Sequence, residues 1–246
     1  MHVCGLSRPE LFTRDRQPLS ADQETALAEL IARRQQGEPL AYLAGRREFW
    51  SLELAVSPAT LIPRPETETL VERALTHIPA DAAWSFADLG TGSGAIALAI
   101  ASERPRCRVV ATDNSPAALA IARANATRLN LTVDFRLGGW LAPLAGETFE
   151  MLVSNPPYVA SGDPYLAALR HEPVTALAAG PDGLDAIRVI AAAARASLKP
   201  DGWLLLEHGY DQAAAVSALL QQHGYKNIGC YPDLTGQDRV SEGQRS

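Results

Sequence analysis

The sequence predicts an α/β protein whose core is a mostly parallel, doubly wound β-sheet with helices on both faces. From about residue 84 onward, short apolar runs typical of buried strands alternate with segments of helical pattern. A glycine-rich turn, 88–94, joins the first of these strands to its helix. With 246 residues, 47% of them hydrophobic, the chain can form one large globular domain, or one large and one small.

The first predicted element is a helix over residues 20–36. Ser20 and Gln23 have capping-box spacing, and apolar residues recur on one face until Gly37 ends the pattern. Residues 45–56 follow as a β-hairpin, because apolar and polar side chains alternate there.

A short amphipathic helix is predicted over 66–77, after Pro63 and Pro65 have interrupted the chain. We expect a domain boundary at its start. Residues 1–65 would form a small helical and hairpin region, and residues 66–246 the larger α/β domain.

The α/β domain is then predicted element by element. Ser115 is a good helix N-cap with Pro116 at the first helical position. Alanine-rich and amphipathic runs predict helices at 94–103, 115–129, 184–198 and 212–223. Apolar runs predict strands at 84–89, 107–112, 131–137, 149–153, 203–207, 225–231 and 239–242.

Composition limits the classes of function. Cys4, Cys107 and Cys230 form no CxxC or Cys/His cluster, which argues against structural zinc and for a reducing compartment. No apolar stretch approaches the length of a membrane span. The formal net charge of -6 disfavours loose binding to nucleic acid. We therefore expect a cytoplasmic protein with no metal, no membrane contact and no nucleic-acid partner.

The glycine-rich turn predicts a site for an adenosine cofactor. Gly90, Gly92 and Gly94 let backbone N–H groups approach a ligand closely. Asp113 ends the next strand, where its carboxylate can accept hydrogen bonds from two ribose hydroxyls. A tight turn without a ligand is the alternative, and the placement of Asp113 argues against it.

S-adenosylmethionine is favoured over a dinucleotide. Gly90, Gly92 and Ala95 also satisfy the dinucleotide fingerprint GxGxxA, but nothing downstream resembles a hydride-transfer site. Asp88 would repel a pyrophosphate, whereas it could hold the ammonium group of a methionine moiety, directly or through water. Trp140, after the next strand, either lies against the adenine ring or fills the core.

Asn155, Pro156, Pro157 and Tyr158 form the most informative motif, directly after the predicted strand 149–153. Two prolines cannot continue a sheet, and they remove backbone donors while the carbonyls of Asn155 and Pro156 remain acceptors. The Asn155 side-chain oxygen and these carbonyls suit a planar group that bears an NH2. A carboxamide, adenine and guanine all qualify.

The catalytic hypothesis is positioning by Asn155 and Pro156. Their oxygens would accept the two hydrogens of the substrate NH2 and aim its nitrogen at the methyl group, at about 3–3.5 Å. No base stands in the motif, so the proton is expected to leave to solvent. His208 is read as a packed histidine, and Glu172 either pairs with Arg64 or faces water.

Five segments stand in a characteristic order: 37–72, which contains IPRPETE, 88–105, which begins DLGTGSG, VSNPPY (153–158), HEPVTALAAGPDGL (171–184) and LLLEHG (204–209). Together they resemble the HemK/PrmC family of N5-glutamine methyltransferases of peptide chain release factors. The resemblance covers residues from about 37 to the C-terminus. DLGTGSG alone indicates only a class I methyltransferase, and NPPY is shared with adenine-N6 and some guanine-N2 enzymes, whereas IPRPETE is much more specific.

The resemblance implies a seven-stranded class I S-adenosylmethionine-dependent methyltransferase with an N-terminal helical substrate-docking region. It implies that Asn155 to Tyr158 hold the glutamine of the GGQ loop of class I release factors. The cofactor would be held by Asp88, Gly90, Thr91, Gly92, Ser93, Gly94, Asp113, Trp140 and Asn155. This chain departs from the family's pattern in two places. The N-terminal region is expected to be shortened, and Gly139 replaces a residue that is commonly acidic in the family.

Other functions remain open from the residues alone. A nucleic-acid amine fits the same acceptors after base flipping, but no target-recognition insertion or basic, aromatic-rich tract is present. A ribosomal-protein glutamine methyltransferase is disfavoured by IPRPETE. A cofactor-binding accessory subunit would bind the cofactor without transferring its methyl group.

Overall fold

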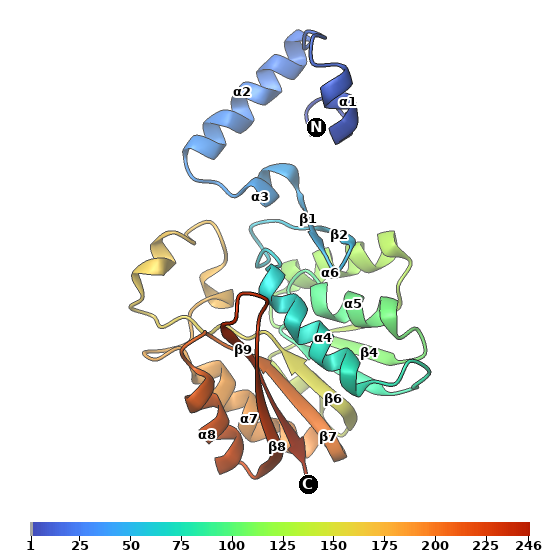
Figure 1. Cartoon of the computed structure of the whole chain (residues 1–246), viewed down its shortest axis with the longest axis vertical. Helices are drawn as coiled ribbons and strands as arrows, with labels where there is room; N and C mark the ends of the chain where they lie inside the picture. The colour runs from blue at the N-terminus through green and yellow to red at the C-terminus, as the bar shows by residue number, and fades with distance from the viewer. Residues whose placement is uncertain (1) are drawn as a thin grey trace.

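The computed structural model describes residues 2–246, which form an α/β body with a helical arm at the N-terminal end (Figure 1). The arm consists of α1 (Arg8–Thr13), α2 (Ala21–Gln35) and α3 (Leu40–Ala44). The hairpin of β1 (Arg46–Phe49) and β2 (Leu52–Ala55) then leads into the body. Helix α2 buries no residue, whereas α3 buries Tyr42 and Leu43.

The body is built on a seven-stranded sheet with the order β5-β4-β3-β6-β7-β9-β8. Strands β5, β4, β3, β6 and β7 pair in parallel, while β9 runs antiparallel between β7 and β8. The strands are β3 (Ser85–Leu89), β4 (Arg108–Asp113), β5 (Asp134–Leu137), β6 (Phe149–Ser154), β7 (Leu198–Glu207), β8 (Tyr225–Pro232) and β9 (Asp238–Arg245). The predicted mostly parallel, seven-stranded sheet is confirmed.

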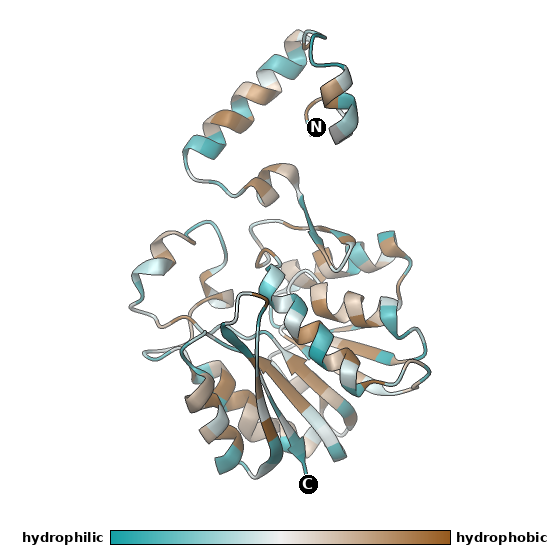
Figure 2. Cartoon of the chain, in the orientation of Figure 1, coloured by the Kyte–Doolittle hydropathy of each residue, from teal (hydrophilic) through white to brown (hydrophobic). Residues whose placement is uncertain are grey.

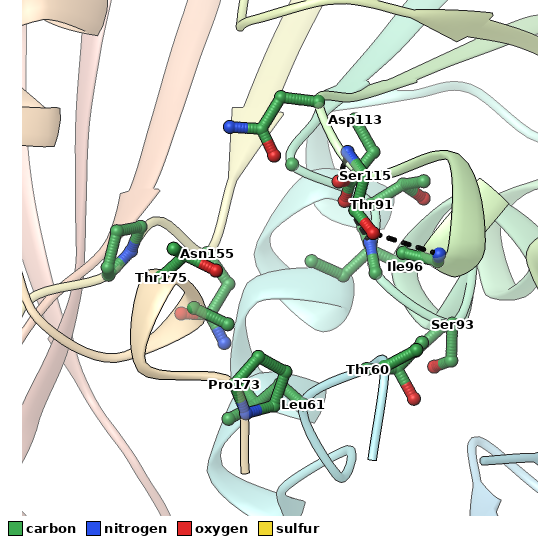
Figure 3. A pocket seen from close by; sticks show the side chains of 18 of the residues that line it. Thr60, Leu61, Thr91, Ser93, Ile96, Asp113, Ser115, Asn155, Pro173 and Thr175 are labelled. Carbon is green, nitrogen blue, oxygen red and sulfur yellow. Dashed lines mark hydrogen bonds between the residues drawn. The ribbon is translucent and has the colours of Figure 1, made fainter. Parts of the chain in front are cut away.

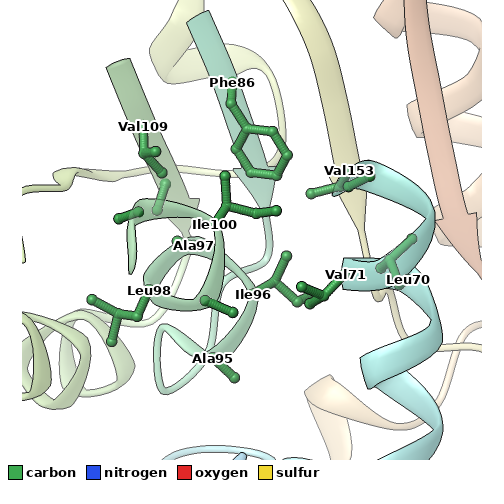
Figure 4. Packing of buried hydrophobic residues seen from close by; sticks show 14 of the residues in the cluster. Leu70, Val71, Phe86, Ala95, Ile96, Ala97, Leu98, Ile100, Val109 and Val153 are labelled. Atoms are coloured by element: carbon green, nitrogen blue, oxygen red, sulfur yellow. The ribbon is translucent and has the colours of Figure 1, made fainter. Parts of the chain in front are cut away.

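Helices cover both faces of this sheet, because successive strand residues point to opposite sides. Phe86 in β3 packs in a core with α4 and α5 (Figure 4), whereas its neighbour Ala87 packs in a core with α7 and α8. Figure 2 shows the hydrophobic strands lying between these layers. The body helices are α4 (Glu68–His77), α5 (Ala95–Glu103), α6 (Pro116–Leu129), α7 (Asp185–Ser197) and α8 (Ala213–Gln222), with 3-10 turns η1 (Pro65–Thr67), η2 (Ala142–Leu144), η3 (Pro164–Ala167) and η4 (Val174–Ala176).

Local capping signals predicted helix starts well. The reciprocal hydrogen bonds between Ser20 and Gln23 form, and the Ser115 side chain caps α6. Strand β7 was predicted too short: it begins at Leu198, which pairs with Phe149 before the register shifts. Pro200 lies in this irregular stretch, where a missing N–H is tolerated. Helices α1 and α3 were not predicted, since each is too short to show a periodic pattern, and the capping box of Ser7 and Glu10 at the start of α1 was missed.

The β1–β2 hairpin closes with an unusual turn. Trp50 and Ser51 have φ values of 51° and 57°, a region that non-glycine residues rarely adopt. Tertiary contacts hold the turn in place: the Trp50 N–H donates to Glu68 Oε1 and its indole Nε1–H to Glu103 Oε1, each at 2.9 Å. The hairpin is thereby attached to α4 and α5 of the body.

Within residues 2–246, none of the helices combines the length and the apolar character that crossing a membrane requires. Over the same residues, no cluster of three or more His, Cys, Asp or Glu side chains is arranged to hold a metal ion.

Candidate active site

The glycine-rich turn after β3 adopts the conformation that its sequence requires. Gly90, Gly92 and Gly94 have φ values of 79°, 56° and 88°. A Cβ atom on Gly90 would lie 2.9 Å from the Trp140 ring, so the bare backbone allows that ring to pack across the loop. A Cβ on Gly94 would meet Leu98 and Ala122, so the absence of a side chain lets this residue fit there as the N-cap of α5.

A cavity of about 390 Å³ opens beside this loop, at the carboxyl ends of β3, β4 and β6 (Figure 3). Asp113 lines one side, where Oδ2 accepts from Gly92 N–H at 2.8 Å and Oδ1 from Ser115 N–H at 2.9 Å. Asn155 lies across the cavity from Asp113. Of the predicted cofactor-binding residues, those lining the cavity are Gly90, Thr91, Gly92, Ser93, Asp113, Trp140 and Asn155.

Asp88, which we expected to hold an ammonium group, does not line this cavity. It is fully buried behind the loop, where Oδ2 accepts from the Thr91 hydroxyl at 2.6 Å and from Ala97 N–H at 3.2 Å. Oδ1 has no hydrogen-bond partner among the described residues. Burial raises the pKa of Asp88 to about 7, against the effect of the Thr91 hydrogen bond. Here Asp88 supports the loop, and its contact with a ligand remains a prediction.

The cavity fits an adenosine cofactor. A Cβ built on Gly92 meets nothing within 4 Å, so the loop backbone is open to a ligand at this point. Each Asp113 oxygen keeps lone pairs for ribose hydroxyls after its backbone hydrogen bond. The Trp140 ring supplies a flat apolar face on the same cavity.

A second cavity, of about 620 Å³, adjoins the first, and Asn155 lines both. Leu61, Arg64 and Ala176 are the other residues common to the two cavities. The Asn155 Nδ2 donates to Thr67 Oγ1 at 3.0 Å, which leaves Oδ1 free of that contact. Asn155 therefore stands where a cofactor in one cavity would meet a substrate in the other.

The rest of the NPPY motif divides between the two cavities. Pro156 and Tyr158 line the second cavity, and Pro157 lines the first. The Tyr158 hydroxyl donates to Glu207 Oε1 at 3.2 Å. Burial, followed by the nearby Glu207 carboxylate, raises the pKa of the Tyr158 hydroxyl. Tyr158 thus keeps its proton and serves as a fixed, flat wall.

An ion pair that the sequence left undecided forms at one side of the site. Arg64 Nη2 pairs with Glu172 Oε1, and Glu172 Oε2 accepts from Ile62 N–H at 3.0 Å. Glu172 is buried. It therefore ties the 62–64 loop to the segment between β6 and α7 that lines both cavities. His208 is also buried, with its ring between the Gly209 carbonyl and Ser241 Oγ, as expected for a packed histidine.

Sequence reasoning missed Thr67, which accepts from Asn155 and also lines the first cavity, and Glu207, which accepts from the Tyr158 hydroxyl. Glu207 carried a usable signal: it is charged and ends an apolar strand, as Asp113 does. Thr67 carried none, because a threonine beside a helix start is ordinarily read as a cap. Thr60 and Leu61, which also line the cofactor cavity, precede IPRPETE and had no distinctive pattern.

Comparisons with known proteins bear on the fold and the family. Residues 67–175 match the family "Methyltransferase small domain", and residues 1–45 match the "PrmC N-terminal domain". A methyltransferase from Pyrococcus furiosus has a TM-score of 0.62 at 18% identity, covering 90% of this chain and 98% of that one. A T. thermophilus 16S rRNA methyltransferase in complex with AdoMet and guanosine also scores 0.62, at 17% identity, covering 82% of this chain and 50% of that one.

Fold and site together define a class I S-adenosylmethionine-dependent methyltransferase. Curated relatives identify the family within this class of methyltransferases. A release factor glutamine methyltransferase of Xylella fastidiosa is 52% identical over 99% of this chain and 90% of its own length. Those of Coxiella burnetii and Salmonella typhimurium are 48% and 47% identical, each over 99% of this chain and 88% of their own length. The chain belongs to the release factor glutamine methyltransferase family.

Proposed function

We propose that this enzyme methylates the side-chain amide nitrogen of the glutamine in the GGQ loop of class I peptide chain release factors. The position of Asn155, on the wall shared by the two cavities, is the observation that carries the proposal. The names of the curated relatives support the same substrate. Because release factors act in translation, we also expect the protein in the cytoplasm.

Asn155 and Pro156 are the proposed catalytic groups. The Asn155 Oδ1 and the Pro156 carbonyl would accept the two amide hydrogens of the substrate glutamine and hold its NH2 plane. When bound, S-adenosylmethionine supplies the methyl group on an electron-deficient sulfonium centre. The two oxygen acceptors also stabilise positive charge that develops on the amide nitrogen. Pro157 and Tyr158 complete the proposed substrate site.

The cofactor is proposed to lie against the 90–94 loop. The backbone of Gly90, Thr91, Gly92, Ser93 and Gly94 would lie against it at close range. The N–H groups of Gly90 and Thr91 donate to the Thr112 carbonyl, that of Gly92 to Asp113 Oδ2 and that of Gly94 to the Thr91 carbonyl, so the glycines would provide close approach rather than N–H donors. Asp113 would accept the ribose hydroxyls, and Trp140 would lie beside the adenine. Asp88 would act from behind the loop, directly or through water.

We propose that residues 1–65 dock the substrate protein and residues 66–246 carry the chemistry. Leu27 and Ile31 on α2 are exposed, so this helix face has no partner within the described chain. The second cavity lies between the two regions, with Leu61 and Arg64 from one and Tyr158 from the other.

A labelling experiment tests the substrate. The protein is incubated with methyl-labelled S-adenosylmethionine and a class I release factor, the same factor with its loop glutamine changed to alanine, a ribosomal protein, or DNA. We expect label only in the intact release factor. Label in DNA alone, or in the glutamine-to-alanine factor as strongly as in the intact one, would overturn the proposal.

A further inference from the structure

Asn155 can accept a substrate N–H only if its own amide group is turned the right way. Half a turn of the side-chain amide exchanges its oxygen and nitrogen, and only the oxygen accepts hydrogen bonds. Here Nδ2 donates to Thr67 Oγ1 at 3.0 Å. A hydroxyl cannot enforce this choice by itself, because it can either donate to the amide oxygen or accept from the amide nitrogen.

Glu207 is placed to direct the Thr67 hydroxyl. Its carboxyl group is fully buried at the end of β7, and Oε1 accepts from the Tyr158 hydroxyl. Oε2 has no hydrogen-bond partner within residues 2–246. The Thr67 hydroxyl faces this carboxyl closely enough to lower its pKa, although no well-aligned hydrogen bond joins the two groups. A buried carboxylate oxygen that lacks a hydrogen-bond donor strongly favours the orientation in which a neighbouring hydroxyl donates to it.

We propose that Glu207 is a positioning residue that orients the Asn155 amide through Thr67. An ionised carboxylate has no hydrogen to give, so the Thr67 hydroxyl donates toward Glu207. The lone pairs of Thr67 then remain for Asn155, which must turn Nδ2 to them and Oδ1 to the substrate. The inference rests on the proposed function, because it assigns Oδ1 to the substrate amide.

The relay depends on the charge of Glu207. A protonated carboxyl can donate to Thr67, whose hydroxyl is then free to donate to Asn155 Oδ1 and hold the amide the wrong way round. Burial raises the pKa of Glu207 to about 7, so the change of orientation falls near neutral pH. We expect kcat to rise as pH increases through this range and then to level off.

Charged and titratable groups from the surrounding elements set the protonation equilibrium of Glu207. Glu66 from η1 raises the pKa of Glu207, whereas Arg239 from β9 and the Tyr158 hydroxyl, after β6, lower it. Burial lowers the pKa of His208, the residue that follows β7. Burial also raises the pKa of Asp88, behind the cofactor loop, to about 7, so the pH profile of a Glu207 variant is needed to assign the change to Glu207.

Variants of nearly unchanged shape separate orientation from packing. Glu207→Gln can both donate and accept, so it no longer dictates the direction of the Thr67 hydroxyl. Thr67→Val removes the hydroxyl, and Thr67→Ser restores it. For Glu207→Gln and Thr67→Val we expect kcat to fall about tenfold or more with the KM for S-adenosylmethionine changed by about twofold at most. Thr67→Ser should recover most of this loss.

The double variant provides the sharper test. Residues that act through one relay are not additive, so Glu207→Gln with Thr67→Val should be little slower than the slower single variant. The rise of kcat near neutral pH should disappear in Glu207→Gln. Glu150→Gln is the matched control, since Glu150 is paired with Lys199 near the start of β6, whereas Glu207 lies at the end of β7. The kcat and the pH profile of this variant should match those of the unaltered enzyme.

An NMR measurement keeps this inference separate from the choice of substrate. In protein labelled with ¹⁵N-asparagine, the Asn155 amide signals should shift with pH near neutrality, and this shift should vanish in Glu207→Gln. An unaltered enzyme that leaves release factors unlabelled would refute the proposed function, while the NMR result still decides the relay. Additive kcat losses, or an Asn155 signal that titrates equally in Glu207→Gln, would overturn the relay.

Discussion

At the scale of the residue, Asn155 connects the two halves of the site. It follows β6, lines both cavities, and has its nitrogen engaged by Thr67. The residue types of NPPY predicted an acceptor site at a strand end. The two cavities that meet at Asn155 could not be predicted, because they are formed by segments far apart in the sequence.

Removal of the Asn155 amide should mainly slow the transfer step. For Asn155→Ala we expect kcat to fall on the order of 100-fold, because an acceptor for developing charge is lost. Single-turnover kinetics with a release factor would measure this loss. A sharp pH optimum that disappears in His171 or His208 variants, with Asn155→Ala still active, would contradict it.

Gly90→Ala should weaken cofactor binding. A Cβ at φ 79° is strained and would lie 2.9 Å from the Trp140 ring, displacing that ring or the loop. We expect an affinity for S-adenosylmethionine about tenfold lower or worse, equivalent to about 1.4 kcal/mol. Calorimetric titration measures it. Gly162→Ala is the control, since a Cβ there meets nothing within 4 Å and Gly162 lines neither cavity, so the cofactor affinity of this variant should be unchanged.

At the scale of the element, the glycine loop and the β1–β2 hairpin show two uses of positive φ. The loop uses glycines, so its conformation could be inferred from the sequence. The hairpin turn uses Trp50 and Ser51, and its φ values could not be inferred, because contacts with Glu68 and Glu103 stabilise it from outside.

Ser51→Gly should therefore stabilise the protein. At φ 57° a side chain is strained, and we expect a gain of about 0.5–1 kcal/mol in the free energy of unfolding. Urea unfolding would measure it. Glu53→Gly, within β2, should instead destabilise by a similar amount, since glycine weakens a strand. Equal losses for both variants would show that the turn stores no strain.

At the scale of the whole molecule, the arm contacts the body through the end of α2 and through Tyr42 of α3, whose hydroxyl donates to the Thr60 carbonyl at 2.6 Å. Arg170 Nη2 donates to the Gln36 carbonyl at the end of α2, and a His171 ring nitrogen lies 3.3 Å from the same oxygen. The hairpin packs more deeply, with Phe49 and Leu54 in the core shared with α4 and α5. The division of the chain at residue 65 remains a prediction, although the packing of the hairpin with the body is clear.

Two buried carboxyl groups should make global stability depend on pH. Burial raises the pKa values of Asp88 and Glu207 to about 7, above their ordinary values, so the folded state binds more protons between about pH 4.5 and 7. The free energy of unfolding of the cofactor-free protein should fall as pH rises through this window, by up to about 1.4 kcal/mol per pH unit for each group. Asp233, with its pKa lowered to about 2, acts in the opposite sense and only below about pH 4.

Urea unfolding at pH 5, 6, 7 and 8 would measure this dependence. Glu207→Gln should show a shallower fall and should be more stable than the unaltered protein at pH 8. An identical pH dependence in the two proteins would show that Glu207 ionises normally in the folded state.

The sequence by itself determined the order of the elements, the doubly wound sheet, the glycine loop, the Asp113 and Asn155 strand ends, and the resemblance to the glutamine methyltransferases. The structural features follow from local periodicity, caps and glycine positions, which depend on residues close together in the chain, and the resemblance follows from the sequence motifs themselves. Only the tertiary structure decided that Asp88 lies behind the loop, that Glu172 pairs with Arg64, and that Thr67 and Glu207 lie behind Asn155. Those relations join residues separated by long stretches of chain, and burial and hydrogen bonding between such residues exist only once the sheet has formed.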